Sequence, residues 1–169
     1  SACGEDEDSV SMALTATRRL MHRQDVLPRQ VGTLRVFSSS LLDRSKSMKG
    51  ELMALLEASR CADVEGVDRY GASEDSMSAL FDCLSWACSD EWDGRWALAV
   101  CPDVRTDQFV PGAAAIAALV GPSAPAQLQR GYESHFVHRY DASRPVGWRG
   151  SAPITETSGR AGRHAHCVG

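Results

Sequence analysis

Residues that bind metals are gathered at two places in this sequence. His164, His166 and Cys167 are zinc-type ligands, and His135 and His138 stand three residues apart. A structural zinc site needs four ligands at suitable spacing, and no fourth ligand accompanies the first group. We therefore interpret the first group as part of a solvated tail and the two spaced histidines as packing residues of the fold.

Carboxylate pairs and serines offer acid–base or nucleophilic chemistry elsewhere. The pairs Asp63 with Asp68 and Asp103 with Asp107 have the spacing of loop and capping residues. The triplet Ser38–Ser40 lacks the flanking glycines of a nucleophile elbow, and the sequence contains no glycine-rich phosphate loop. The residue types alone therefore indicate no catalytic centre.

Composition restricts the class of protein. The 169 residues carry a formal net charge of -4, and the basic residues are scattered, so no nucleic-acid footprint is visible. No apolar run approaches the roughly 18 residues that cross a bilayer, so we expect no transmembrane segment. The acidic stretch Glu5–Asp8 indicates neither a signal peptide nor an arginine-rich transit peptide. Six cysteines without a Cys-x-x-Cys pair are typical of reduced, buried thiols in an intracellular protein.

Hydrophobic periodicity predicts alternating helices and strands. Helices are expected over residues 9–24, 45–59 and 74–89, and strands over 33–37, 64–67, 96–101 and 113–120, with 126–130 pairing with the last strand. The run 96–101 is continuously apolar, as in a strand buried on both sides. The alternation predicts an α/β domain with a largely parallel sheet. Residues 151–169 lack periodicity and are expected to be irregular.

The third predicted helix has the clearest pattern. We assign one buried face to its apolar residues at helical spacing, namely Met77, Leu80, Phe81, Leu84 and Cys88. Trp86, Trp92 and Trp96 cluster around the turn that follows, where they anchor either a core or a partner surface.

Four ordered segments and a histidine-containing stretch carry a resemblance to a known family. They are Asp43–Ser47, Asp63–Asp68, Trp92–Leu98 and Leu119–Pro125, continued by His135, His138, Tyr140, Asp141 and Pro145. In order and spacing they resemble eukaryotic 3-hydroxy-3-methylglutaryl-CoA (HMG-CoA) synthase, of the thiolase superfamily. The resemblance implies a partial thiolase-like half over residues 1–150, a mostly parallel sheet with helices on its faces, and an irregular tail over 151–169. It also implies that the first strand and the second half of the family's longer chain are missing here.

The resemblance also assigns the family's reactive positions. The family condenses acetyl-CoA with acetoacetyl-CoA, using a cysteine that becomes acetylated, a glutamate as general acid and base, and a histidine that orients the thioester. By the resemblance, the cysteine position holds Ser73, the glutamate position holds Ser39, and the histidine would lie beyond this sequence. The family's loop after Asp103 is shortened and loses a substrate-contacting asparagine, and Val110 replaces a threonine. No catalytic residue is therefore retained.

The chemistry of Ser73 favours a structural role. A cysteine thiol at a helix N-terminus has a lowered pKa, whereas a serine hydroxyl stays protonated unless a base removes its proton. Ser73 is followed by Glu74 and Asp75, which is typical of a helix N-cap with charges that complement the helix dipole. We interpret Ser73 as a helix cap rather than a nucleophile.

The sequence leaves three functions open. The first is a catalytically inactive HMG-CoA synthase-like domain, without cofactor, that serves as a structural or interaction subunit among other proteins of a larger assembly. The second is a remnant that binds acyl-CoA, against which the altered loop argues. The third is a fragment of an active synthase. Ser73 and Ser39 favour the first. The resemblance implies cytosol or mitochondria, and we favour mitochondria by analogy with an orphaned metabolic-enzyme domain inside a large mitochondrial assembly.

Overall fold

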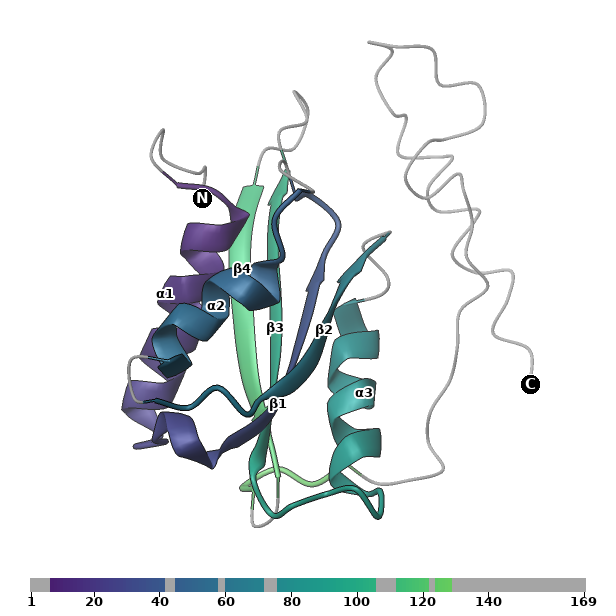
Figure 1. Cartoon of the computed structure of the whole chain (residues 1–169). Coiled ribbons are helices and arrows are strands. Elements are labelled where there is room, and N and C mark those ends of the chain that lie inside the picture. The colour runs from purple at the N-terminus through teal and green to yellow at the C-terminus, as the bar shows by residue number, and fades with distance from the viewer. Residues whose placement is uncertain are drawn as a thin grey trace, which may run out of the picture. The chain divides into compact units, whose positions relative to one another are not determined.

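The computed structural model describes residues 7–41, 45–57, 60–71, 76–105, 112–121 and 124–128. The chain divides into two compact units, Ser1–Pro125 and Ala126–Gly169. All described helices and strands belong to the first unit (Figure 1). In chain order they are α1 (Ser9–Arg23), η1 (Pro28–Gln30), β1 (Val31–Ser38), α2 (Met48–Glu57), β2 (Glu65–Tyr70), α3 (Ser76–Ala87), β3 (Trp96–Arg105) and β4 (Gly112–Val120).

The strands form one four-stranded sheet in the order β2-β1-β3-β4. β1 runs parallel to both β2 and β3, and β4 pairs antiparallel with β3. Leu34 of β1 lies opposite Gly66 of β2 on one side and opposite Leu98 of β3 on the other. The predicted α/β class with a mostly parallel sheet is confirmed.

Helices cover both faces of this sheet, as Figure 1 shows. Side chains of a strand alternate between faces, so Leu34 and Val36 of β1 join the apolar cluster beneath α1 and α2. Phe37 points the other way, into the cluster beneath α3. The run Ala97–Val100 of β3 is at most 4% exposed, which confirms a strand buried on both sides.

Local signals explain where the first two helices begin. Asp8 and Ser11 form a reciprocal capping box at the start of α1, with 2.7 Å from the Ser11 amide to the Asp8 carboxylate. At α2 the Ser47 hydroxyl accepts from the Gly50 amide at 2.9 Å, and Asp68 of β2 accepts from the Lys49 amide at 2.8 Å. Asp68 thus caps a helix, as its spacing suggested.

The buried face of α3 differs from the predicted one. The residues that contact the sheet are Ala79, Cys83 and Trp86, whereas Met77 is 51% exposed and Cys88 is exposed. Apart from the polar stripe of Ser78, Asp82 and Ser85, α3 is apolar around its circumference, so periodicity alone cannot select the buried face. Small side chains let the helix approach the sheet closely, and this packing decides the orientation.

Three other predictions need correction. β3 continues to Arg105, so Asp103 lies in a strand rather than in a loop. The strand predicted over 126–130 is absent from its described part, Ala126–Leu128. The three tryptophans divide between clusters, because Trp86 and Trp92 pack beneath α3 whereas Trp96 packs against the α1–α2 side. Within the described residues, no helix combines the length and apolar character needed to span a membrane.

Candidate functional site

The site predicted from the sequence begins where β1 ends. Ser38 is the last residue of β1, and Ser39 and Ser40 follow it as the chain leaves the sheet. β3 is the parallel neighbour of β1, and it brings Asp103 to the same edge. The triplet of serines and a carboxylate far away in sequence therefore form one polar cluster at the carboxyl ends of two central strands.

One oxygen of Asp103 organises this cluster. Its Oδ1 accepts from the Ser39 amide at 2.9 Å, from the Ser39 hydroxyl at 2.8 Å and from the Ser40 hydroxyl at 2.9 Å. The Ser38 hydroxyl lies farther from it, at 3.4 Å. The Ser40 hydroxyl also accepts from the Val104 amide at 2.7 Å. These hydrogen bonds link the end of β1 to β3, and the hydroxyl groups of Ser39 and Ser40 act as donors in them.

This arrangement can hold a turn in place but offers little for proton transfer. A serine becomes a nucleophile when histidine, lysine or a terminal amine takes its proton. Ser39 instead donates to a carboxylate, which strengthens the hydrogen bond without changing the protonation of the hydroxyl. The cluster therefore has a structural role, which is to hold the ends of β1 and β3 together.

Several predicted site residues lie outside the described residues. These are Ser73, Val110, Asp107, His135, His138, and the group His164, His166 and Cys167. α3 begins at Ser76, three residues after Ser73. The interpretation of Ser73 as a helix cap therefore stays a prediction, as do the interpretations of His135 and His138 as packing residues and of the last group as a solvated tail.

Cys83 of α3 and Cys101 of β3 both belong to the apolar cluster between α3 and the sheet. Burial raises the pKa of the Cys83 thiol to about 12, against a smaller lowering by the Arg35 guanidinium. Burial, and then the charge of Asp103, raise the pKa of the Cys101 thiol. Neither thiol is poised as a thiolate nucleophile. The predicted burial of the cysteines is confirmed for Cys61 and Cys83, whereas Cys101 is only partly buried and the prediction is wrong for Cys88, which is exposed.

Native-state alkylation is expected to distinguish Cys83 of α3 from Cys88, which directly follows this helix. At pH 8 about one Cys83 thiol in ten thousand is ionised, and its side chain is fully buried. We expect iodoacetamide to modify Cys88 at least about 100-fold faster than Cys83. Timed alkylation followed by peptide mass spectrometry measures both rates, with urea-unfolded protein as the control in which the rates converge. Equal rates in the folded protein would contradict this burial of α3.

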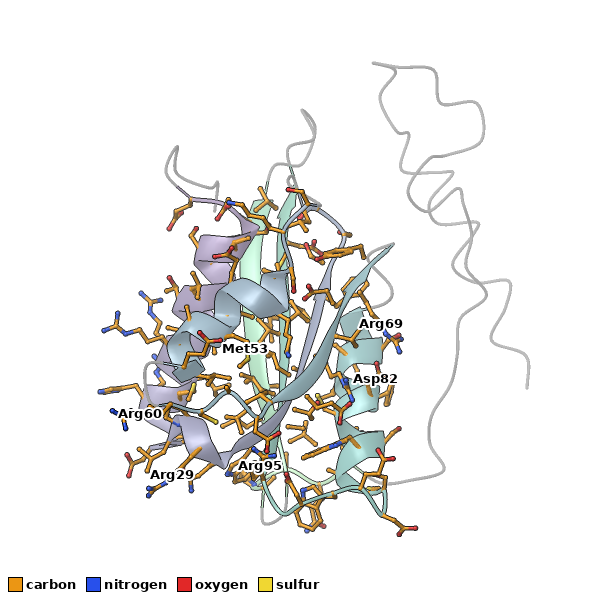
Figure 2. The ribbon with its side chains drawn as sticks, in the orientation of Figure 1. Arg29, Met53, Arg60, Arg69, Asp82 and Arg95 are labelled. Atoms are coloured by element: carbon orange, nitrogen blue, oxygen red, sulfur yellow. The ribbon has the colours of Figure 1, made fainter. Side chains whose placement is uncertain are left out.

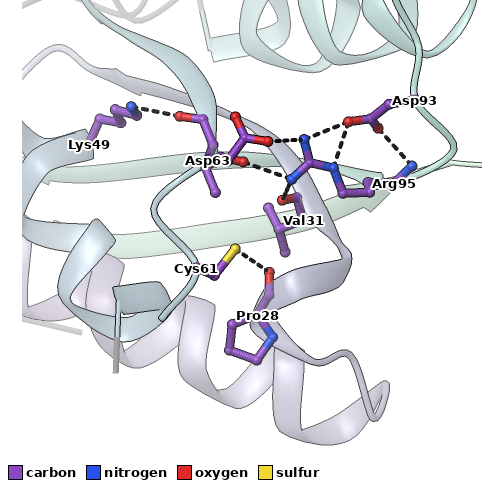
Figure 3. A network of polar contacts seen from close by, with 8 residues as sticks. Pro28, Val31, Lys49, Cys61, Asp63, Asp93 and Arg95 are labelled. Atoms are coloured by element: carbon purple, nitrogen blue, oxygen red, sulfur yellow. Dashed lines mark hydrogen bonds and ion pairs between the residues drawn. The ribbon is translucent and has the colours of Figure 1, made fainter. Parts of the chain in front are cut away.

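Three further carboxylates, those of Asp63, Asp93 and Asp82, pair with arginine side chains. Asp63 lies 3.3 Å from the Arg95 guanidinium, which also contacts Asp93 at 2.6 Å (Figure 3). Hydrogen bonds from Arg95 lower the pKa of the Asp93 carboxyl, overcoming the opposing effect of desolvation. Arg69 of β2 reaches Asp82 of α3 at 2.9 Å (Figure 2). Among the described residues, no three His, Cys, Asp or Glu side chains are grouped so as to hold a metal ion.

Sequence reasoning missed the central role of Asp103. The apolar run of β3 stops at Cys101, and the predicted strand ended there. Proline has no amide hydrogen, so Pro102 leaves no backbone donor unpaired and the strand continues through it. The signal that could have identified Asp103 is its place just past an apolar strand that is the parallel neighbour of the serine-containing strand.

Comparison with known proteins identifies the family. Residues 1–125 match the family model for the N-terminal region of hydroxymethylglutaryl-coenzyme A synthase. The mitochondrial hydroxymethylglutaryl-CoA synthase of Sus scrofa is 38% identical over 149 residues, 85% of this chain and 29% of the relative. The cytoplasmic synthase of Gallus gallus is 40% identical, with 85% of this chain and 28% of the relative covered. The chain thus spans less than a third of these relatives' length.

Solved structures agree with this assignment. MvaS in complex with 3-hydroxy-3-methylglutaryl coenzyme A superposes with a TM-score of 0.61 and 30% identity, covering 68% of this chain and 28% of MvaS. The HMG synthase of the curacin biosynthetic pathway gives a TM-score of 0.60 at 26% identity, covering 69% of this chain and 29% of its own. The four-stranded sheet with its three helices is accordingly a thiolase-like fold, and the chain belongs to the hydroxymethylglutaryl-CoA synthase family.

Proposed function

We propose that this chain is a synthase-family domain without condensation chemistry of its own, and that it serves as a structural or interaction module of a larger assembly. The observation that carries the proposal is Ser39. It occupies the position that the resemblance assigns to the family's general acid, and its hydroxyl donates to Asp103 at 2.8 Å.

A serine cannot replace a carboxylic acid at this position. General acid–base catalysis contributes about 10²- to 10⁴-fold and requires a group whose pKa lies near the working pH. An alcohol remains protonated there and is a very weak acid. Ser39 and Ser40 both donate a hydrogen bond to the same carboxylate oxygen. These two hydroxyl groups are therefore engaged within the cluster rather than directed at a substrate.

The nucleophile position supports the same conclusion. The resemblance places Ser73 where the family has its acetylated cysteine, and Glu74 and Asp75 follow it. Two carboxylates that follow a serine oppose the development of an alkoxide, because nearby negative charge raises the pKa of a group that must become an anion. Both positions that carry the family's covalent and acid–base steps are thus occupied by serine.

Apolar surface supports an interaction role. Several large apolar side chains are exposed, and they lie on α3 and on both edge strands of the sheet: Val67 at 41%, Met77 at 51% and Ile116 at 67%. α3 is apolar around most of its circumference, which is typical of a helix with partners on more than one side. These side chains are available to a partner protein at α3 and at the two edges of the sheet.

The test is acetyl transfer and condensation by the purified chain. The chain is incubated with acetyl-CoA and acetoacetyl-CoA, with the Sus scrofa synthase as positive control. We expect neither an acetyl adduct nor condensation product above the buffer blank. The double variant Ser39→Glu/Ser73→Cys is expected to remain inactive, because the loop after Asp103 also departs from the family pattern. Turnover by the unmodified chain would overturn the proposal.

Other outcomes favour the alternative functions. Saturable acyl-CoA binding without turnover supports an acyl-CoA-binding remnant, and condensation by a longer protein containing these residues supports a fragment of an active synthase. Co-migration with unrelated subunits in native gel filtration supports the structural role. The matched relatives include both mitochondrial and cytoplasmic synthases. We favour mitochondria, and subcellular fractionation tests that location.

A further inference from the structure

Basic side chains that are scattered along the sequence lie together at one end of the described fold. The exposed residues in the last two turns of α1 are all basic, namely Arg18, Arg19, His22 and Arg23. α2 contacts both α1 and η1, and exposed arginines follow in η1 (Arg29) and just after α2 (Arg60). The Cys61 thiol donates to the Pro28 carbonyl at 3.4 Å, which keeps Arg60 close to Arg29 (Figure 2). We call the surface formed by these six basic side chains the basic end.

The charge of the basic end exceeds what the fold needs there. Residues 18–30 and 57–61 carry five arginines against the carboxylates of Asp25 and Glu57, a net charge of +3, whereas the whole chain carries -4. The ion pairs among the described residues use other arginines, namely Arg35, Arg69 and Arg95. Complementing the dipole of α1 requires cations only in its last turn, where His22 and Arg23 lie. The remaining arginines of the basic end therefore have no structural task within the described fold.

The backbone of Arg60 supports a use for its side chain outside the chain. Arg60 has a φ of 58°, in the left-handed region that glycine adopts without strain and other residues adopt rarely. The Arg60 amide donates to the Glu57 carbonyl at 2.7 Å, a bond that glycine would make equally well. A side chain kept at a strained position without a role in the local structure points to a functional role.

Leu27 adds an exposed apolar group to the basic end. It lies in the connection between α1 and η1, two residues before Arg29, and is 46% exposed. Single-stranded nucleic acids bind where bases can stack on aromatic side chains, and residues 18–30 and 57–61 contain no Phe, Tyr or Trp. An exposed leucine among arginines instead suits the interface of a membrane, where apolar groups enter the acyl boundary and cations lie at the phosphates.

We propose that the basic end docks the chain on a membrane surface rich in anionic phospholipids. Leu27 enters the interfacial layer, and the surrounding guanidinium groups bind headgroup phosphates, for which their forked geometry is well suited. η1 directly precedes β1, whereas Ser39 follows the far end of this strand. The docking surface and the Ser39–Asp103 cluster thus lie at opposite ends of β1, and the inference is independent of whether the chain retains condensation chemistry.

Vesicle co-sedimentation of the 169-residue chain tests the proposal. The probes are vesicles of phosphatidylcholine with about 30% phosphatidylserine, and vesicles of phosphatidylcholine alone as the neutral comparison. We expect binding to the anionic vesicles only, and weaker binding as salt is raised. An arginine near an anionic surface contributes about five-fold to the partition coefficient, so Arg29→Gln should lower it by about that factor.

Lys46→Gln is the matched control, because it makes the same change of charge elsewhere. Lys46 is exposed and precedes α2, whereas Arg60 follows this helix. The ten residues of α2 place the two ends about 15 Å apart, beyond the Debye length of about 8 Å in physiological salt. Lys46→Gln should therefore leave the partition coefficient within about two-fold of the unmodified value. A loss as large as that of Arg29→Gln would overturn the assignment to the basic end.

Two further variants separate binding from folding. Arg60→Gly should weaken vesicle binding about five-fold without lowering the melting temperature, because glycine adopts the left-handed backbone freely. Leu27→Ser should also weaken binding about five-fold, but with the salt dependence unchanged, because it removes an apolar contact rather than a charge.

Three results would overturn the proposal. The first is no binding to anionic vesicles, and the second is equal binding to neutral and anionic vesicles. The third is tighter binding to a single-stranded RNA oligonucleotide than to vesicles at the same phosphate concentration, which would assign the basic end to nucleic acid instead.

Discussion

Gly66→Ala is expected to lower the free energy of unfolding by about 3 kcal/mol, at the upper end of the cost of overpacking. A Cβ atom at Gly66 would overlap the carbonyl oxygen of Leu34 and lie 3.0 Å from its carbonyl carbon. The obstacle is the backbone of the paired strand, which cannot turn away as a side chain can. β2 must therefore separate from β1 near the start of their ladder. Urea unfolding followed by tryptophan fluorescence measures the loss.

Gly50→Ala is the matched control, with the opposite sign. Gly50 lies in α2, and a Cβ there would meet only the Ser47 side chain at 3.4 Å, an ordinary contact. Alanine stabilises a helix relative to glycine, so we expect a gain of about 0.5 kcal/mol. If Gly66→Ala were no more destabilising than Gly50→Ala, the close parallel pairing of Leu34 with Gly66 would be wrong.

Patterns that depend on near neighbours in the sequence predicted most of the fold. The apolar run at 96–101 identified β3 as a buried central strand, because both faces of such a strand must be apolar. Helical spacing located all three helices to within a few residues. The alternation of strands with helices then restricted the sheet to a largely parallel one, since parallel neighbours need a crossover between them.

Features that depend on tertiary packing could not be predicted in this way. The buried face of α3 was misassigned because larger apolar residues suggested a core, whereas close packing selected Ala79 and Cys83. The partner of Ser39 was also missed. Asp103 is separated from it by more than sixty residues and reaches it only because β1 and β3 are neighbours in the sheet. Local hydrophobic periodicity does not determine the order of strands in a sheet.

The resemblance and the structure describe two different properties of Ser39. The resemblance locates Ser39 at a position that is reactive in other members of the family. The structure shows what the hydroxyl does here, which is to donate to Asp103 while its amide does the same. The family's catalysts need an acid at this position. Ser39 instead links the ends of β1 and β3 through its hydrogen bonds to Asp103.

Arg95→Ala is expected to lower the free energy of unfolding by about 2 kcal/mol. The Arg95 guanidinium donates to the backbone carbonyls of Asp63 at 2.7 Å and Val31 at 3.3 Å (Figure 3). It thereby joins the start of β1, the segment before β2 and the start of β3. Its side chain is only 26% exposed, so removing it leaves carbonyl groups without their charged donor. Chemical denaturation compares the variant with the unmodified chain.

Asp63→Ala separates the ion pair from the carbonyl contacts. The Asp63 side chain is 97% exposed and lies 3.3 Å from the guanidinium, and exposed ion pairs contribute at most about 1 kcal/mol. Alanine retains the Asp63 carbonyl that accepts the shorter bond, so we expect a loss below about 0.5 kcal/mol. Arg95→Lys should fall between the two, because one ammonium cannot serve both carbonyls and Asp93 as the forked guanidinium does. A loss for Asp63→Ala as large as that for Arg95→Ala would mean that charge pairing, rather than the backbone contacts of Arg95, fastens these three segments.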